Sequence, residues 1–185
     1  MSHLPAGDVT FLFSDMEGST RLWERFPEAM PAVLARHDAL FSEAVTTGGG
    51  DIFKRGGDSF CIAFPHPSAA LTAGLAVQLG LHRQSWPLPE GQTPRVRIAL
   101  HLGRADQRDG DYFGLALSQT ARLLAAAHGG QTLVSESAAA VLHVSLPEQA
   151  GLISHGRHRL KDLAQPQEIF QLIHPDLPTE FPPLR

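Results

Sequence analysis

The stretch VTFLFSDMEGST, residues 9–20, decides how the rest of the chain is interpreted. Residues 9–14 form a short apolar run rich in β-forming side chains, which predicts a buried strand. The run ends at Asp15, and the polar, glycine-containing residues after it predict a turn into a helix, with Ser19 and Thr20 as candidate caps. The stretch therefore places a carboxylate where a strand ends and a helix begins.

A second carboxylate lies in DIFKRGGDSFCIAF, residues 51–64, which is typical of a β-hairpin with its turn at Gly56-Gly57-Asp58. Strand ends and hairpin tips of one sheet can meet at one edge. Two carboxylates there suit Mg²⁺, which prefers oxygen ligands and completes its shell with water and phosphates. The Glu17–Thr20 turn can offer backbone N–H groups to a phosphate. Taken alone, either aspartate could instead be a helix cap or a turn residue.

The remaining pattern predicts a mixture of hairpins and helical crossovers. We expect helix over 21–45, broken by Pro27 and Pro31, helix over 68–82, loop over 85–94, strand over 95–103, polar loop over 104–110, helix over 115–127, strand over 131–134, a short helix capped by Ser135 and ending at Leu142, and strands near 156–160 and 168–173. This order predicts an α+β fold with one mainly antiparallel sheet and helices packed on it.

Composition excludes several classes of protein. The 185 residues are 43% hydrophobic and 18% charged, which suits one domain with one core, and no apolar run approaches the roughly 20 residues that span a bilayer. The first residues do not resemble a signal peptide. The single cysteine, Cys61, excludes a disulfide framework, and we expect a cytoplasmic protein. The net charge of -4 argues against nucleic-acid binding.

Two further features of the sequence lead to expectations. The last twelve residues, HPDLPTEFPPLR, carry four prolines, so we expect residues 175–185 to be a linker after a domain of residues 1–174, in a fragment of a longer protein. Among 15 basic residues, the lysines are only Lys54 and Lys161. In an arginine-rich chain, these two positions are candidates for a specific role.

Five motifs in order resemble the catalytic domain of class III adenylate/guanylate cyclases: residues 11–20, 53–60, 97–103, 110–114 continuing to 121–123, and 159–163. The resemblance extends from about Asp8 to Ile173 and is greatest for a bacterial subgroup in which the domain precedes an ATPase and regulator region. It implies the ferredoxin-like class III cyclase fold. GGDSF also resembles the GGDEF signature of diguanylate cyclases, but Ser59 and the flanking motifs favour the mononucleotide cyclases.

The resemblance implies a metal and phosphate site. Asp15, Asp58 and the Met16 carbonyl would hold two Mg²⁺ or Mn²⁺ ions. Backbone N–H groups of the turn would bind the β- and γ-phosphates, and a lysine would reach the triphosphate. These residues are Gly18, Ser19, Thr20 and Lys161.

The resemblance also implies a base and transition-state site, in which Lys54 and Asp111 read the purine and Arg122 stabilises the transition state. Lysine and aspartate together favour adenine, so the implied reaction converts ATP into 3′,5′-cyclic AMP and pyrophosphate. In this family the active site is shared between subunits, which implies a head-to-tail homodimer.

One departure from the family pattern matters most, and two smaller ones are Ala99 and Leu115-Ala116. Ser118 stands where the family has an asparagine, four residues before Arg122, and losing one such contact can cost on the order of 10²–10³ in rate. We therefore expect a weak adenylate cyclase. The alternative is a catalytically impaired nucleotide-binding or dimerisation module that senses ATP for a downstream regulator.

Overall fold

The computed structural model describes residues 4–89 and 91–185, so Met1 to His3 and Glu90, which belong to the expected domain and its loop, lie outside the described part. The strands are β1 (Asp8–Met16), β2 (Asp51–Gly56), β3 (Ser59–Phe64), β4 (Val96–Arg104), β5 (Asp106–Arg108), β6 (Asp111–Phe113), β7 (Thr132–Ser135), β8 (Gly151–His158) and β9 (Gln167–Ile173). The helices are α1 (Ser19–Arg25), α2 (Met30–Gly48), α3 (Pro67–Arg83), α4 (Leu115–Ala126) and α5 (Glu136–Leu142).

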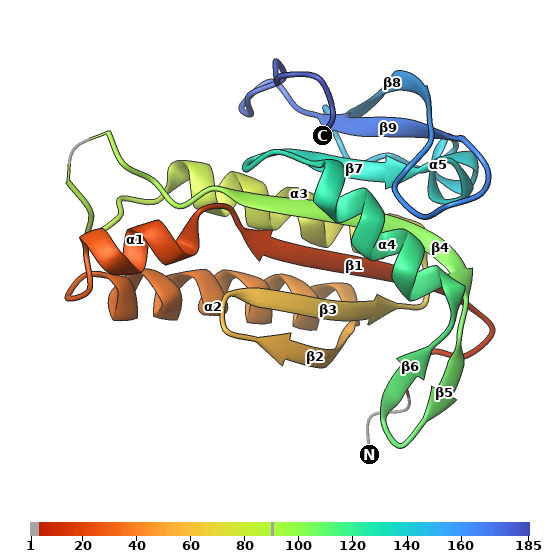
Figure 1. Ribbon diagram of the computed structural model, residues 1–185, viewed down its shortest axis with the longest axis horizontal. Helices are drawn as coiled ribbons and strands as arrows, with labels where there is room; N and C mark the ends of the chain where they lie inside the picture. The colour runs from red at the N-terminus through yellow and green to blue at the C-terminus, as the bar shows by residue number, and fades with distance from the viewer. Residues whose placement is uncertain (1–3, 90) are drawn as a thin grey trace.

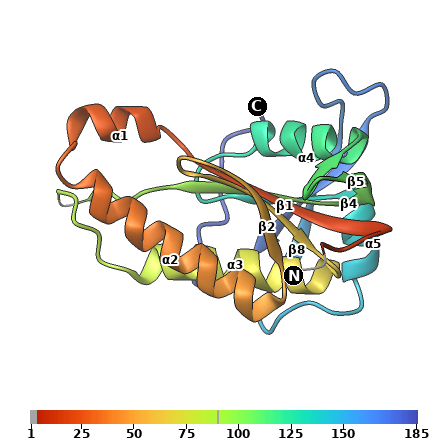
Figure 2. The ribbon, with the colours of Figure 1, turned by 90° about the horizontal axis from the view of Figure 1, so that it is seen from below.

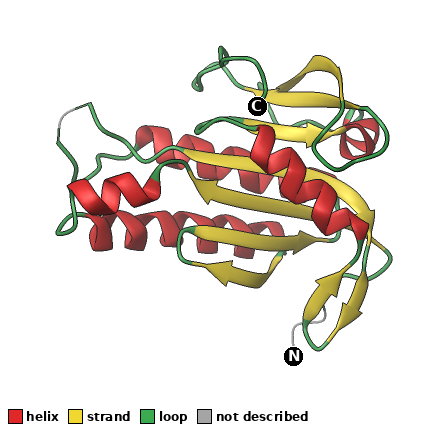
Figure 3. Cartoon of the chain, viewed as in Figure 1, coloured by secondary structure: helices red, strands yellow, loops and turns green. Residues whose placement is uncertain are grey.

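Seven strands form one sheet in the order β2-β3-β1-β4-β7-β9-β8, and β5 and β6 form a separate hairpin (Figures 1 and 3). Among the described strands of this sheet, β4 and β7 pair in parallel, with α4 in the crossover between them, and the other neighbours pair antiparallel. The predicted α+β fold with a mainly antiparallel sheet is confirmed.

Helices cover both faces of the sheet, with α2 and α3 on one side and α4 on the other (Figure 2). Strand β1 lies between β3 and β4 and is buried on both faces. Phe11 and Phe13 belong to the cluster beneath α4, whereas Leu12 belongs to the core against α2 and α3. This two-sided burial explains why apolar side chains occupy successive positions 11–13 and why Thr10 and Ser14 are buried as well.

Several predicted boundaries are confirmed. The helical stretch after β1 is broken at Pro27, which lies between α1 and α2, but not at Pro31, which occupies the first turn of α2, where a missing N–H costs nothing. Ser135 caps α5 by accepting a hydrogen bond from the Ala138 N–H at 3.4 Å. The C-terminal segment, residues 174–185, contains no helix or strand, as its prolines predict (Figure 3).

Three predictions about local structure are wrong. Residues 104–110 are not simply a polar loop, since β5 lies there and pairs with β6 as a hairpin, and strands of three residues each are too short to show apolar alternation. The strand expected at 156–160 is β8, which starts at Gly151 and is interrupted by an irregularity between Ser154 and Arg157. The N-cap of α1 is Gly18, not Ser19 or Thr20.

Helix α4 approaches β4 closely at Gly103. A Cβ atom at this position would lie 2.9 Å from the Ala116 Cβ and 2.9 Å from the His101 Nε2. The absence of a side chain at Gly103 therefore sets how near α4 can lie to the sheet, and with it the position of Ser118 and Arg122 on the same helix.

We expect Gly103→Ala to lower the free energy of unfolding by about 1–3 kcal/mol, because the added methyl overpacks the contact between α4 and β4. Urea denaturation measures the change. The double variant Gly103→Ala/Ala116→Gly removes one of the two clashing groups and should recover part of the loss. Wild-type stability of Gly103→Ala would contradict the assigned packing role.

Candidate functional site

Asp15 and Asp58 lie at the same end of the sheet. The paired residues of β1 and β3 end with Ser14 opposite Phe60, so Asp15 lies directly beyond this pair in β1 and Asp58 lies two residues from Phe60 in the hairpin turn. This end faces α1, while β5 and β6 extend from the opposite end (Figure 1). The predicted meeting of a strand end and a hairpin tip is therefore present in the fold.

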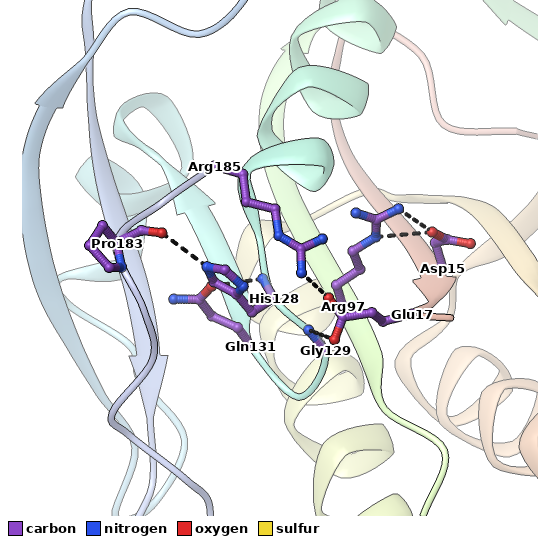
Figure 4. A network of polar contacts seen from close by, with 8 residues as sticks. All are labelled: Asp15, Glu17, Arg97, His128, Gly129, Gln131, Pro183 and Arg185. Carbon is purple, nitrogen blue, oxygen red and sulfur yellow. Dashed lines mark hydrogen bonds and ion pairs between the residues drawn. The ribbon is translucent and has the colours of Figure 1, made fainter. Parts of the chain in front are cut away.

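Arg97 of β4 forms an ion pair with one of these carboxylates, that of Asp15. It lies opposite Asp15 in the antiparallel pairing, and its Nε donates to the Asp15 Oδ2 at 2.9 Å (Figure 4). The two side chains are 23% and 28% exposed, so the pair is only partly screened by water. Sequence reasoning gave Arg97 no role. Its position became significant only when strand register placed it beside Asp15.

Asp58, in contrast to Asp15, lacks a partner in the described part of the chain. Its Oδ2 atom is buried and has no hydrogen bond among the described residues. A buried carboxylate oxygen is costly unless a donor or a cation compensates it. A divalent cation ligated by Asp58 would supply that compensation. The donor set therefore fits a metal ion at this position.

The nature of the donors indicates which metals fit. Within residues 4–89 and 91–185 no group of three or more histidine, cysteine or acidic side chains is arranged to hold a metal. Two carboxylates and a backbone carbonyl are instead typical of Mg²⁺ or Mn²⁺, which retain water and take further oxygens from phosphates. The candidate ligands are Asp15, Asp58 and the carbonyl of Met16.

Gly18 makes the turn from β1 into α1. Its φ is 70°, a left-handed conformation that glycine adopts without strain, and its carbonyl accepts hydrogen bonds from the N–H groups of Arg21 and Leu22. The turn thus presents the first residues of α1, Ser19 and Thr20, next to the carboxylate of Asp15. The first N–H groups of a helix have no partner within that helix.

A second group of predicted residues gathers around β2 and β6. The Lys54 Nζ lies 3.6 Å from the Asp111 Oδ2, although 57 positions of sequence separate the two residues (111 − 54). The Asp111 Oδ1 accepts from the Tyr112 N–H at 2.8 Å, which fixes that carboxylate. Cys61 pairs with Lys54 across the ladder, and burial raises the pKa of its thiol to about 11, so it remains neutral.

The third group contains Arg122 and Lys161. The Arg122 guanidinium lies 2.5 Å from the Asp162 Oδ2, so the turn that follows β8 brings Lys161, the neighbour of Asp162, towards α4. Asp162 was not assigned a role from the sequence. Ser118 lies one helical turn before Arg122 on the same helix.

No hydrogen bond or ion pair in the described part of the chain joins the metal-binding group to Lys54, Asp111, Arg122 or Lys161. In the described part of the chain the predicted residues therefore lie in three separate groups. One contains the carboxylates of Asp15 and Asp58, the second contains the Lys54–Asp111 pair, and the third contains Arg122 and Lys161.

His101 lies beneath α4 and supports its position. It is 5% exposed, the Gln119 side chain of α4 hydrogen-bonds it, and the Ser137 hydroxyl lies 3.4 Å from its Nδ1. Burial lowers the pKa of His101 to about 4, so the imidazole is neutral at pH 7.

Comparison with known proteins identifies the kind of domain that carries these groups. The family model described as the adenylate and guanylate cyclase catalytic domain matches residues 1–174. An uncharacterized protein of Mycobacterium tuberculosis is 41% identical over 184 residues, which cover 98% of this chain and 61% of that protein. An adenylate cyclase of Lachancea kluyveri is 33% identical over 155 residues, covering 71% of this chain and 8% of that one.

A solved structure of an adenylate cyclase from Trypanosoma brucei, described as monomeric, superimposes on this fold with a TM-score of 0.85. The identity is 28%, and the match covers 100% of this chain and 96% of the other. The chain spans only about three-fifths of the length of the mycobacterial protein, so the comparison concerns the domain and not the whole of that protein.

We expect His101 to make the fold sensitive to acid. Its folded-state pKa of about 4 lies below the unfolded value of roughly 6.5, so the unfolded chain binds more protons between these pH values. Stability should be fully present above pH 6.5 and fall by up to about 1.4 kcal/mol per pH unit between pH 6.5 and pH 4. Urea denaturation at several pH values measures this slope.

The matched variants are His101→Gln, which should flatten the slope, and His66→Gln, which changes an exposed histidine and should leave it unchanged. An unaltered slope in His101→Gln would show that other groups cause the acid sensitivity.

Proposed function

The chain belongs to the family of adenylate and guanylate cyclase catalytic domains, and we propose that it is an adenylate cyclase that converts ATP into 3′,5′-cyclic AMP and pyrophosphate. The observation that carries this proposal is the pairing of Lys54 with Asp111 at 3.6 Å. The pair presents one cationic donor and one anionic acceptor side by side, on side chains that are 65% and 32% exposed and therefore accessible to a ligand.

The Lys54–Asp111 pair fits adenine in particular. The ammonium group can donate to N1 of the purine, and the carboxylate can accept from the 6-amino group. Guanine carries a donor at N1 and an acceptor at position 6, so both contacts would become unfavourable. The preference for ATP over GTP therefore follows from the charge of each partner.

We assign the metal and phosphate functions to the group around Asp15 and Asp58. Asp15, Asp58 and the Met16 carbonyl would hold two Mg²⁺ or Mn²⁺ ions, and the N–H groups of Gly18, Ser19 and Thr20 would bind the β- and γ-phosphates. When bound, the ions would lower the pKa of the ribose 3′-hydroxyl and neutralise the α-phosphate. Arg97, which pairs with Asp15 in the free chain, would then be available to the triphosphate.

Arg122 and Lys161 complete the assignment. Arg122 would leave Asp162 and donate to the oxygens of the α-phosphate as negative charge develops on them, and Lys161 would bind the triphosphate. Ser118 would take the place of the family asparagine in positioning the ribose. Its single hydroxyl is shorter than an amide, so we expect slow turnover.

We further propose that the active site forms in a head-to-tail homodimer. Within one chain no polar contact among the described residues joins the metal half, Asp15 and Asp58, to the base half, Lys54, Asp111, Arg122 and Lys161, and a second copy facing the first would bring opposite halves together. Each chain contains both halves, so such a dimer would hold two equivalent sites.

The wider setting of the domain is also a proposal. We expect residues 1–174 to be the catalytic domain and residues 175–185 to lead to a downstream ATPase or regulator region, in a cytoplasmic protein that binds neither nucleic acid nor membrane through this domain. The described residues include no helix with the length and apolar character needed to cross a bilayer. The alternative function, a nucleotide-binding or dimerisation module that senses ATP, is favoured only by Ser118.

Cyclic AMP formation from ATP with Mn²⁺ or Mg²⁺ tests the proposed reaction. We expect slow product formation by the wild-type chain and a rate higher by on the order of tenfold or more in Ser118→Asn, which restores the amide. Asp58→Asn should abolish product because it removes a metal ligand. If neither the wild type nor Ser118→Asn forms product at high protein concentration, the alternative module is the better description.

Replacement of the purine-reading lysine tests substrate choice. In Lys54→Glu the donor becomes an acceptor, so the ratio of kcat/KM for ATP to that for GTP should fall at least about tenfold, equivalent to roughly 1.4 kcal/mol. Arg108→Gln, which changes an exposed cation on the neighbouring β5–β6 hairpin, is the matched control and should keep the ratio. An unchanged ratio in Lys54→Glu would refute the role of Lys54.

A further inference from the structure

Glu17 is an acidic residue inside the β1 exit, which we define as residues 15–20, and the mechanism above gives it no role. Its backbone N–H donates to the Arg95 carbonyl at 2.8 Å. Its Oε2 accepts from the Gly129 N–H at 3.1 Å, and its Oε1 forms an ion pair with Arg185 (Figure 4). Three different parts of the chain therefore hold one residue.

The backbone of Gly129 lies very close to the Glu17 carboxylate. A Cβ atom on Gly129 would lie 2.6 Å from the Glu17 Oε2 and 2.6 Å from the Arg95 Cβ, distances that real side chains do not show. Glycine is thus required for the backbone of this loop to reach the carboxylate. The contact follows from tight local geometry and not from two flexible surface groups.

The C-terminal segment is anchored to the same loop. The Pro183 carbonyl lies 3.0 Å from the His128 Nε2 (Figure 4). The Arg185 N–H donates to the Ala126 carbonyl, at the end of α4, at 3.1 Å. Residues 183–185 therefore lie beside the loop that contains Gly129, and the Arg185 guanidinium forms its ion pair with Glu17 there.

A buried polar network extends this anchoring into the sheet. The Gln171 Nε2 of β9 donates to the Thr179 carbonyl of the segment at 2.9 Å, while the Gln171 Oε1 accepts from the Gln131 Nε2 at 2.8 Å. The Gln131 Oε1 in turn accepts from the His128 N–H at 3.0 Å. Both glutamines are only 1% exposed, so the path from the segment to the loop is fixed.

The segment bridges a hollow in the surface. A cavity of about 690 Å³ is bounded by Glu17 and Arg95 on the domain and by Leu177 and Phe181 on the segment. Leu177 and Leu184 of the segment pack against the core clusters, so the ion pair of Arg185 with Glu17 is one of several contacts that hold it.

Both partners of Glu17 favour its charged form. Burial alone would raise the pKa of Glu17, but the hydrogen bonds from Arg185 and from the Gly129 N–H outweigh burial, and the pKa lies below its usual value. The Glu17 side chain is 28% exposed and that of Arg185 46% exposed. An ion pair this exposed contributes little to global stability, so its effect should be local.

We propose that Glu17 is a positioning residue through which the C-terminal segment fixes the β1 exit and thereby sets the affinity of the site for the metal–triphosphate group. The inference rests on the proposed function for its ligand. The β1 exit contains Asp15, the Met16 carbonyl and the N–H groups assigned to the phosphates. Glu17 lies between Met16 and Gly18 in the same stretch of backbone. A small displacement of such a group is enough to weaken a site that depends on several converging contacts.

A graded series of variants separates the contacts. Arg185→Gln removes only the ion pair. Glu17→Gln also removes the charge but keeps an oxygen for the Gly129 N–H, and Glu17→Ala removes both contacts. The matched control is Arg83→Gln, which breaks the exposed ion pair between Arg83 and Asp176 at the other end of the same segment, without touching Glu17.

Two measurements are made on each variant. Hydrogen exchange of the amides of residues 16–20, without nucleotide, reports how firmly the β1 exit is held. Equilibrium binding of a fluorescent ATP analogue with Mn²⁺ reports affinity. We expect Arg185→Gln and Glu17→Gln to speed exchange and weaken binding by about fivefold, Glu17→Ala to do so more strongly, and Arg83→Gln to match the wild type.

The double variant Arg185→Gln/Glu17→Ala should be no worse than Glu17→Ala, because both changes act through one carboxylate. If the exchange rates and the binding affinity of Arg185→Gln stay within about twofold of the wild-type values, and so below the expected change of about fivefold, the inference is wrong. If the wild-type chain binds no ATP analogue, the proposed function fails instead, and the exchange data alone then decide whether Arg185 and Glu17 fix the β1 exit.

Discussion

The structure depends first on the antiparallel pairing of β1 with β3 on one side and β4 on the other. This pairing buries β1 on both faces and fixes its register. Register then places Asp15 at the same sheet end as the hairpin turn that carries Asp58, and opposite Arg97. A shift of one residue would turn every side chain of β1 to the other face and remove the site and the core together.

A second feature unites the site residues, namely that the charges assigned to substrate are paired within the free chain. Asp15 is paired with Arg97, Lys54 with Asp111, and Arg122 with Asp162. These pairs are partly exposed, so each is weak and can be exchanged for a stronger contact with metal or phosphate. Among the described residues, Lys161 and Asp58 are the exceptions, and the buried Oδ2 of Asp58, which has no hydrogen-bond partner there, gains most from a cation.

The two lysines illustrate how composition and structure complement each other. Lys54 and Lys161 stand out in the sequence only because the other 13 basic residues are arginines. In the fold, Lys54 contacts Asp111, and Lys161 precedes the partner of Arg122. A compact ammonium group can serve as a point donor where a planar guanidinium would not fit, which is consistent with both positions lying at the candidate site.

The sequence by itself determined the type and order of most elements, because apolar periodicity, prolines and glycines act over a few neighbouring residues. It also indicated Asp15 and Asp58, since a strand end and a hairpin tip are local features. Only the tertiary structure revealed the β5–β6 hairpin, whose strands of three residues are too short to show apolar alternation, and the partners of the site residues. Arg97 and Asp15 are 82 residues apart, Arg122 and Asp162 are 40 apart, and Arg185 and Glu17 are 168 apart. Such contacts follow from strand register and chain path, which no local pattern specifies.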